Sequence, residues 1–177
     1  MLPAMIMMMT MMMSSIQDAA AGHPVQTVAS VDLQRYVGTW YEIGRYANRF
    51  QRKCVSDVTA TYTLRKDGKV SVLNQCKRAD GRVISAKGVA KIVDPASKAK
   101  LKVTFFWPFY GDYWIIGLDS EYRWAVVGHP ARKYLWILSR TPVLSPEHEA
   151  QVAAVIQESG YEAARIMRTT HTSAAAH

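Results

Sequence analysis

The sequence predicts an all-β fold: an eight-stranded antiparallel barrel with one C-terminal α-helix packed on its outside. Apolar segments with strand-like alternation, separated by turn signals, give eight strands between residues 39 and 140. Gly38-x-Trp40 opens the first strand and Arg140 ends the last, so closure of the barrel would bring the guanidinium over the Trp40 ring. A helix-start signal at Ser145, soon after the last strand, predicts the helix.

The composition fits one domain. The 177 residues, 49% of them hydrophobic, are enough for a substantial core. The net charge of +8 would suit an anionic partner, but Lys and Arg are spread singly along the strands, the densest group being Arg49, Arg52 and Lys53. We therefore expect a solvated basic surface, and the lack of a basic helix or a known binding motif disfavours nucleic acid as a partner.

Residues 1–29 differ from the rest of the chain, since they contain no Lys or Arg and eight of the nine Met residues. The apolar run 1–13 is too short to span a bilayer, and the alanines at 19–21 resemble a signal-peptidase site. We expect a signal segment and tail over 1–29, cleavage after Ala21 and export to the periplasm. The missing basic residues leave an alternative, in which translation starts at an internal Met such as Met13 and the protein is cytoplasmic.

The first elements after this tail are a short helical turn and a strand. Asp32 is a suitable cap for a turn over 32–36, and the first strand covers 39–46. Gly38 lets the backbone approach a neighbour closely because it has no Cβ, and Trp40 supplies a large apolar side chain. We expect these residues to form the closed floor of the barrel.

The clearest hairpin surrounds the turn signal Asp67-Gly68. With Gly68 in the left-handed position of a three-residue loop, Leu64 pairs with Val70 and the same register continues along both strands. This register keeps apolar residues together, whereas a two-residue loop does not. The side chains expected to face inward are Val58, Ala60, Tyr62, Leu64, Val70 and Val72.

Five further strands are expected, at about 83–93, 98–107, 112–118, 122–128 and 133–140. The most regular of them alternates apolar residues with lysines and a threonine, which predicts that its odd positions face inward. These positions are Leu101, Val103, Phe105 and Trp107. The segment 108–111 that follows is expected to be an aromatic surface loop.

The C-terminal region contains the helix and the end of the chain. Ser145 is the expected N-cap, Pro146 takes the first helical position and Gly160 ends the helix, whose apolar face must pack on the barrel. We expect the barrel and helix to occupy 30–168 and residues 169–177 to be mobile.

The chain resembles the lipocalin family at three motifs that occur in the family's order. They are Gly38-x-Trp40-Tyr41-Glu42-Ile43, Tyr122-x-x-Ala125-Val126-Val127 and Trp136-Ile137-Leu138-x-Arg140-Thr141-Pro142. The resemblance covers about 31–168 and is strongest to bacterial lipocalins and apolipoprotein D-like members. It implies an up-and-down barrel that holds one small apolar ligand, with Gly38, Trp40 and Arg140 as a structural motif.

The predicted interior is rich in aromatic residues with hydroxyl or indole groups, which suits an apolar pocket with a few orienting groups. The candidate ligand-binding residues are Tyr62, Asn74, Val103, Phe105, Trp107, Tyr113, Tyr134 and Trp136. Together with the resemblance, this pattern predicts binding and storage or transport of a fatty acid, lysophospholipid or similar lipid, in membrane maintenance. Phe109 and Tyr110, in the aromatic loop at the open end, would contact a membrane surface.

Two cysteines and five histidines carry the remaining reactive groups. The hairpin register places Val58, not Cys54, across from Cys76, so a disulfide and two separate thiols both stay open. An inward Cys76 thiolate acting on a lipid is the enzymatic alternative, and a partner-binding module without a ligand is a third hypothesis. The histidines show no ligand spacing, so the sequence predicts no metal, cofactor or catalytic site, and it leaves the oligomeric state open.

Overall fold

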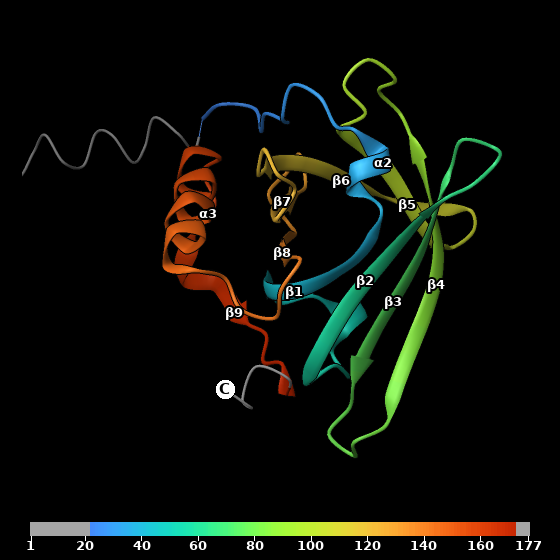
Figure 1. The fold of residues 1–177 in the computed structure, drawn as a ribbon, viewed down its shortest axis with the longest axis vertical. Helices are drawn as coiled ribbons and strands as arrows, with labels where there is room; N and C mark the ends of the chain where they lie inside the picture. Colours follow the sequence, from blue (N-terminus) through green and yellow to red (C-terminus); the bar gives the residue numbers. More distant parts are fainter. Residues whose placement is uncertain (1–21, 173–177) are drawn as a thin grey trace, which may run out of the picture.

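The computed structural model describes residues 22–172 and shows a closed antiparallel barrel with a helix on one side (Figure 1). The barrel strands are β1 (Gly38–Tyr46), β2 (Ser56–Leu64), β3 (Val70–Lys77), β4 (Val83–Ile92), β5 (Lys100–Phe106), β6 (Phe109–Leu118), β7 (Trp124–Gly128) and β8 (Leu135–Ser139). Each strand pairs with the next, β8 pairs with β1, and β1 pairs with β2, which closes the barrel. The predicted fold class is confirmed.

Two helices and three shorter elements complete the described chain. They are α2 (Leu33–Tyr36), η1 (Arg49–Gln51), α3 (Pro146–Glu158), η2 (Ala163–Arg165) and β9 (Ile166–Arg168). Ser145 caps α3 as predicted, because its side chain accepts a hydrogen bond from the backbone N–H of His148. The buried Val152 and Ile156 fix α3 against the outside of the barrel. Strand β9 was not expected from the sequence and pairs with the end of β1.

The β2–β3 hairpin has the predicted register. Leu64 lies opposite Val70, and Tyr62 lies opposite Val72. Gly68 has a φ of 77°, the left-handed conformation that the loop requires. Of the six residues expected to face inward, five are buried and Leu64 is half-buried. Alternation along a strand with one buried face was therefore sufficient to fix this pairing.

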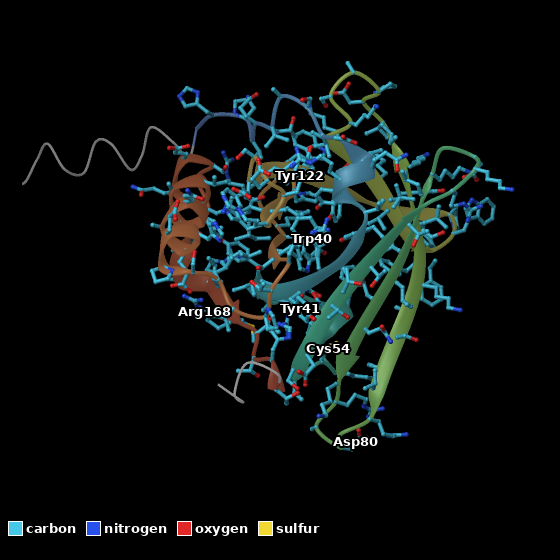
Figure 2. The ribbon with its side chains drawn as sticks, viewed as in Figure 1. Trp40, Tyr41, Cys54, Asp80, Tyr122 and Arg168 are labelled. Atoms are coloured by element: carbon cyan, nitrogen blue, oxygen red, sulfur yellow. A yellow bond between two sulfur atoms is a disulfide. The ribbon has the colours of Figure 1, made fainter. Side chains whose placement is uncertain are left out.

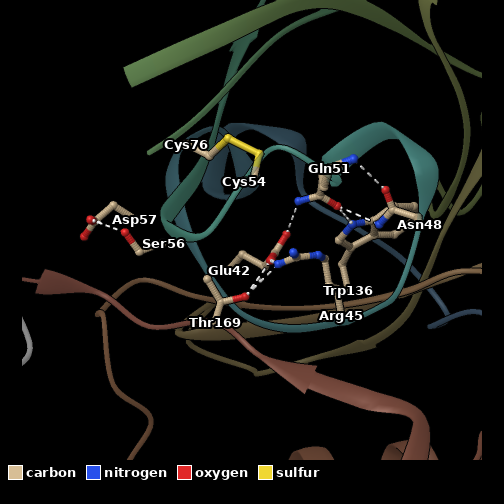
Figure 3. The surroundings of a disulfide bond; sticks show 10 residues. All are labelled: Glu42, Arg45, Asn48, Gln51, Cys54, Ser56, Asp57, Cys76, Trp136 and Thr169. Atoms are coloured by element: carbon tan, nitrogen blue, oxygen red, sulfur yellow. Dashed lines mark hydrogen bonds and ion pairs between the residues drawn. A yellow bond between two sulfur atoms is a disulfide. The ribbon is translucent and has the colours of Figure 1, made fainter. Parts of the chain in front are cut away.

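Near the start of β2 the pairing slips, and this slip settles the state of the cysteines. The register shifts between Ser56 and Thr59, and Asp57 has a φ of 53°. Cys54 and Cys76 form a disulfide with a Cα–Cα distance of 5.5 Å (Figure 3). The predicted register holds as far as Thr59, and beyond it a β-bulge adds one residue, so that Asp57 and Val58 together span the position opposite Cys76. The bend at the bulge brings Cys54 to Cys76, and of the two states left open the disulfide is the one present.

The turn between β5 and β6 is tighter than the expected aromatic loop. The register shifts between Val103 and Phe106, and Phe106 pairs with Phe109, so only Trp107 and Pro108 connect the strands. Trp107 is 82% exposed instead of facing inward, because alternation ends where the register shifts.

Segments at both ends of the described chain pack on the barrel. Val25 is buried and Val28 donates a backbone hydrogen bond to Ile115, whereas the proposed signal segment over 1–21 lies outside the described residues. At the other end the structure differs from the expected mobile segment. His171 is buried and Thr169 hydrogen bonds to Glu42, so 169–172 are part of the packed domain; 173–177 lie outside the described residues.

Candidate ligand-binding cavity

The floor of the barrel is closed by a contact between its first and last strands. The guanidinium carbon of Arg140 lies 3.8 Å from the centroid of the Trp40 ring, as predicted. The same guanidinium donates hydrogen bonds to the carbonyls that end α2, including those of Arg35 and Val37. Gly38 has a φ of 99°, and a Cβ there would lie 3.3 Å from Nη1 of Arg140. Only glycine fits this position without displacing the guanidinium.

Above this floor the barrel encloses a cavity of about 840 Å³. Leu33 and Ile115 line its closed end, and Phe50, Phe106 and Tyr134 line the opposite end, which we call the mouth. The mouth is formed at the end of the barrel that carries four connections, as expected for an up-and-down barrel: β1 to β2, β3 to β4, β5 to β6 and β7 to β8. In Figure 2, Trp40 and Tyr122 lie toward the closed end, and Asp80 marks the β3–β4 turn at the other end.

Seven of the eight candidate ligand-binding residues line this cavity: Tyr62, Asn74, Val103, Phe105, Tyr113, Tyr134 and Trp136. The eighth, Trp107, lies instead in a groove on the outer face of the sheet with Thr104 and Val89. Contact of the seven with a ligand stays a prediction. Sequence reasoning missed Tyr36, because a residue in a helical turn is not covered by strand alternation.

Three tyrosines meet deep in the cavity. The hydroxyl of Tyr113 on β6 lies 2.8 Å from that of Tyr36 on α2 and 2.9 Å from that of Tyr62 on β2. Burial raises the pKa of Tyr62 to about 12, and it raises the pKa values of Tyr36 and Tyr113 well above 10. All three phenols therefore stay protonated and neutral near neutral pH.

A second polar group on the cavity wall is the amide of Asn74. Its cross-strand neighbours are Ala60 on β2 and Ala86 on β4, which leave space in front of it. Its Oδ1 atom is buried and has no hydrogen-bond partner within residues 22–172. A ligand group is one way to satisfy such an atom.

The mouth is both aromatic and charged. Tyr134 stacks on Trp136 with ring centroids 5.7 Å apart, and Phe50 lies 5.9 Å from Tyr134. Arg49 and Lys133 line the cavity at this end. A ligand with an anionic headgroup would place that group here, close to these cations and to water.

A buried carboxylate supports the wall beside the mouth (Figure 3). Glu42 accepts hydrogen bonds from Arg45, from Gln51 at 2.6 Å and from Thr169 at 2.6 Å. Gln51 in turn accepts a hydrogen bond from the indole of Trp136 at 2.9 Å. The network ties the β1–β2 connection to β8 and to the C-terminal segment, so it holds a cavity residue in place.

The structure also allows a search for a reactive thiol, a metal site and a membrane-spanning helix. Cys76 has no free thiol, because it is bonded to Cys54. Within residues 22–172 there is no group of three or more His, Cys, Asp or Glu side chains placed to hold a metal ion. In the same part of the chain no helix is both long and apolar enough to cross a membrane.

A closed β-barrel with a deep, mainly apolar cavity and a few inward polar groups defines a class of proteins that bind small hydrophobic ligands. Comparison with known families identifies the particular family. The model of the lipocalin-like domain matches residues 31–171, and the chain belongs to that family.

Individual proteins are similar to this chain over most of its length. The outer membrane lipoprotein Blc of Citrobacter freundii is 46% identical over 144 residues, 81% of each chain. Temperature-induced lipocalin-1 of Arabidopsis thaliana is 39% identical over 82% of each chain. Apolipoprotein D of Bos taurus is 32% identical over 82% of this chain and 79% of its own. The solved structure of insecticyanin from Manduca sexta has a TM-score of 0.70 at 22% identity, over 85% of this chain and 86% of its own, which shows the shared fold.

Proposed function

We propose that this protein binds and stores or transports a small amphipathic lipid, a fatty acid or lysophospholipid, in the barrel cavity. The observation that carries the proposal is the cavity of about 840 Å³, whose wall is mainly apolar. An acyl chain would enter it from the mouth, and each buried methylene would contribute about 0.8 kcal/mol. The anionic headgroup would stay beside Arg49 and Lys133.

The names of two relatives support a lipid ligand and a place in the cell envelope. One is an outer membrane lipoprotein and another is an apolipoprotein. We infer from them, and from the apolar N-terminal run, that this chain is exported to the periplasm and contributes to membrane maintenance.

The binding role is proposed to be non-catalytic. The enzymatic alternative required a Cys76 thiolate, and the disulfide occupies that sulfur. The cavity-lining tyrosines Tyr62 and Tyr113 are held neutral by burial, so they are poor nucleophiles near neutral pH.

We further propose that the mouth contacts a membrane. Phe109 is 78% exposed, and Phe106 and Trp107 are each 82% exposed beside it. Exposed aromatic side chains grouped at the entrance of an apolar cavity favour contact with a bilayer over contact with water.

A cavity-filling variant tests the proposed function. Ala86 lines the cavity, so Ala86→Trp should fill it and abolish binding of oleic acid, measured by displacement of a fluorescent fatty acid and by native mass spectrometry. Ala153→Trp, on the exposed face of α3, is the matched control and should bind normally. Equal lipid binding by both variants would overturn the proposal that the cavity holds the ligand.

A further inference from the structure

The deep end of the cavity contains more hydrogen-bonding capacity than packing requires. Each phenol has one O–H donor, so Tyr36, Tyr62 and Tyr113 supply three hydrogens. The two contacts between their oxygens use two of them. The third hydrogen has no acceptor among the hydrogen bonds of residues 22–172, although all three residues line the cavity.

Packing of the three tyrosine rings does not require their hydroxyl groups. The rings of Tyr36 and Tyr62 pack 5.7 Å apart, and those of Tyr62 and Tyr113 pack 6.1 Å apart, contacts that phenylalanines would also make. A buried donor without a partner costs free energy. The arrangement is therefore more favourable when an acceptor occupies the cavity.

Asn74 extends the same site toward the mouth. It lies two residues along β3 from Val72, which is the partner of Tyr62. Two residues along a strand span about 7 Å, so Asn74 lies about that much closer to the mouth than the Tyr62–Val72 pair. The Oδ1 atom of Asn74 also has no hydrogen-bond partner within the described residues, so it can accept a hydrogen bond from a hydroxyl group. We call Tyr36, Tyr62, Tyr113 and Asn74 the deep polar site.

We propose that the deep polar site binds a neutral oxygen on the buried part of the ligand, so that the favoured ligands are acyl chains with a hydroxyl or keto group. This inference rests on the proposed function. A neutral oxygen is required because burial makes an anion costly, and the cations lining the cavity, Arg49 and Lys133, lie at the mouth. The carboxylate thus stays at the mouth while the chain oxygen reaches the tyrosines.

Competition between matched lipids tests the inference. Stearic acid is compared with a series of hydroxystearic acids whose hydroxyl lies near the carboxylate, at mid-chain or near the methyl end, by displacement of a fluorescent fatty acid. One position should bind about three- to tenfold more tightly than stearic acid, the gain expected from one hydrogen bond. Tyr113→Phe should remove this preference, so that the favoured hydroxystearic acid binds the variant no more tightly than stearic acid does.

Controls separate the possible failures. Tyr41→Phe deletes a hydroxyl outside the cavity lining and should keep the preference, and Asn74→Val gives a second variant if Tyr113→Phe does not fold. Stearic acid binding as tightly as every hydroxystearic acid would overturn the deep polar site but leave the proposed function standing. Failure of all the lipids to bind the native protein would overturn both.

Discussion

Arg140 joins three parts of the floor through one side chain. Its guanidinium stacks on Trp40, and its N–H groups bond to carbonyls of α2, of β1 and of the segment before β7. A planar guanidinium can donate hydrogen bonds to several unpaired carbonyls at a helix end and stack on an aromatic ring at the same time. A lysine ammonium group could not do both. The residue therefore contributes to closure of the barrel more than to the cavity.

Arg140→Ala should lower the melting temperature by several degrees, a loss of about 1–2 kcal/mol, and leave lipid affinity nearly unchanged. Thermal unfolding and a lipid titration of the same sample check this. Arg35→Ala is the control. Arg35 also lies over an aromatic ring, that of Tyr122, but its side chain is half-exposed, so its removal should lower the free energy of unfolding much less. A stable Arg140→Ala protein with a large affinity loss would contradict the structural assignment.

The buried tyrosines predict a loss of stability in alkali. Burial raises the pKa of Tyr62 to about 12, against about 10 in the unfolded chain. A raised pKa means that the stabilising contribution is complete below pH of about 10 and is lost as pH rises toward 12. For Tyr62 the loss should be about 2–3 kcal/mol, and Tyr36 and Tyr113 act in the same direction.

Urea unfolding at a series of pH values checks this prediction. Between pH of about 10 and 12 the free energy of unfolding should fall less steeply for Tyr62→Phe than for the native protein. Identical slopes for Tyr62→Phe and the native protein would show that this phenol does not titrate in the way proposed.

At the scale of elements, the bulge in β2, the disulfide and the C-terminal segment act on the same stretch of chain. Asp57 accepts hydrogen bonds from the backbone and side chain of Thr172, and its own N–H bonds to Thr170. Cys54, three residues earlier, is bonded to β3. The β1–β2 connection is thus held from two sides, which keeps Gln51 beside Trp136 at the cavity wall.

Removal of the disulfide should therefore cost stability. The bond joins residues separated by 22 positions, and closing a loop of that length in the unfolded chain corresponds to about 3 kcal/mol. Cys54→Ser with Cys76→Ser should lower the free energy of urea unfolding by about this amount. A native protein whose unfolding midpoint does not change in dithiothreitol would contradict the prediction.

The elements show which parts of the fold are readable from sequence. The β2–β3 register was predictable because one face is buried and Gly68 fixes the turn. The shifts near Asp57 and after Val103 were not, because a bulge follows from twist and neighbouring contacts that leave no local pattern. Strand β9 is only three residues long, so periodicity could not reveal it.

The same limits apply to the site at the scale of the whole molecule. Alternation located the wall residues on regular strands, such as Tyr62 and Trp136. It placed Trp107 incorrectly, since the strand is irregular there, and it missed Tyr36, which enters the cavity from α2. The polar groups at the two ends of the cavity come from separate elements that lie side by side only in the folded barrel. Their grouping therefore cannot be predicted from any single segment of the sequence.

The mouth and the floor of the barrel differ in a way that predicts how lipid enters. The exposed aromatics Phe106, Trp107, Phe109 and Tyr110 lie at the mouth, whereas the floor is closed by Trp40 and Arg140. The exposed residues Arg52 and Lys53 belong to the β1–β2 connection at the mouth and would favour anionic headgroups. We expect the protein to approach a bilayer with its mouth first.

Phe109→Ser with Tyr110→Ser should therefore slow lipid uptake from anionic vesicles, while the affinity for free lipid in solution changes much less. Stopped-flow quenching of the protein's tryptophan fluorescence measures the uptake, and equilibrium titration measures the affinity. Val93→Ser with Val143→Ser is the matched control, because these residues are also exposed but lie near the closed end. Uptake as fast as in the native protein would contradict membrane contact and favour entry of lipid from solution, since a bilayer-docked mouth must lose speed when its apolar contact is removed.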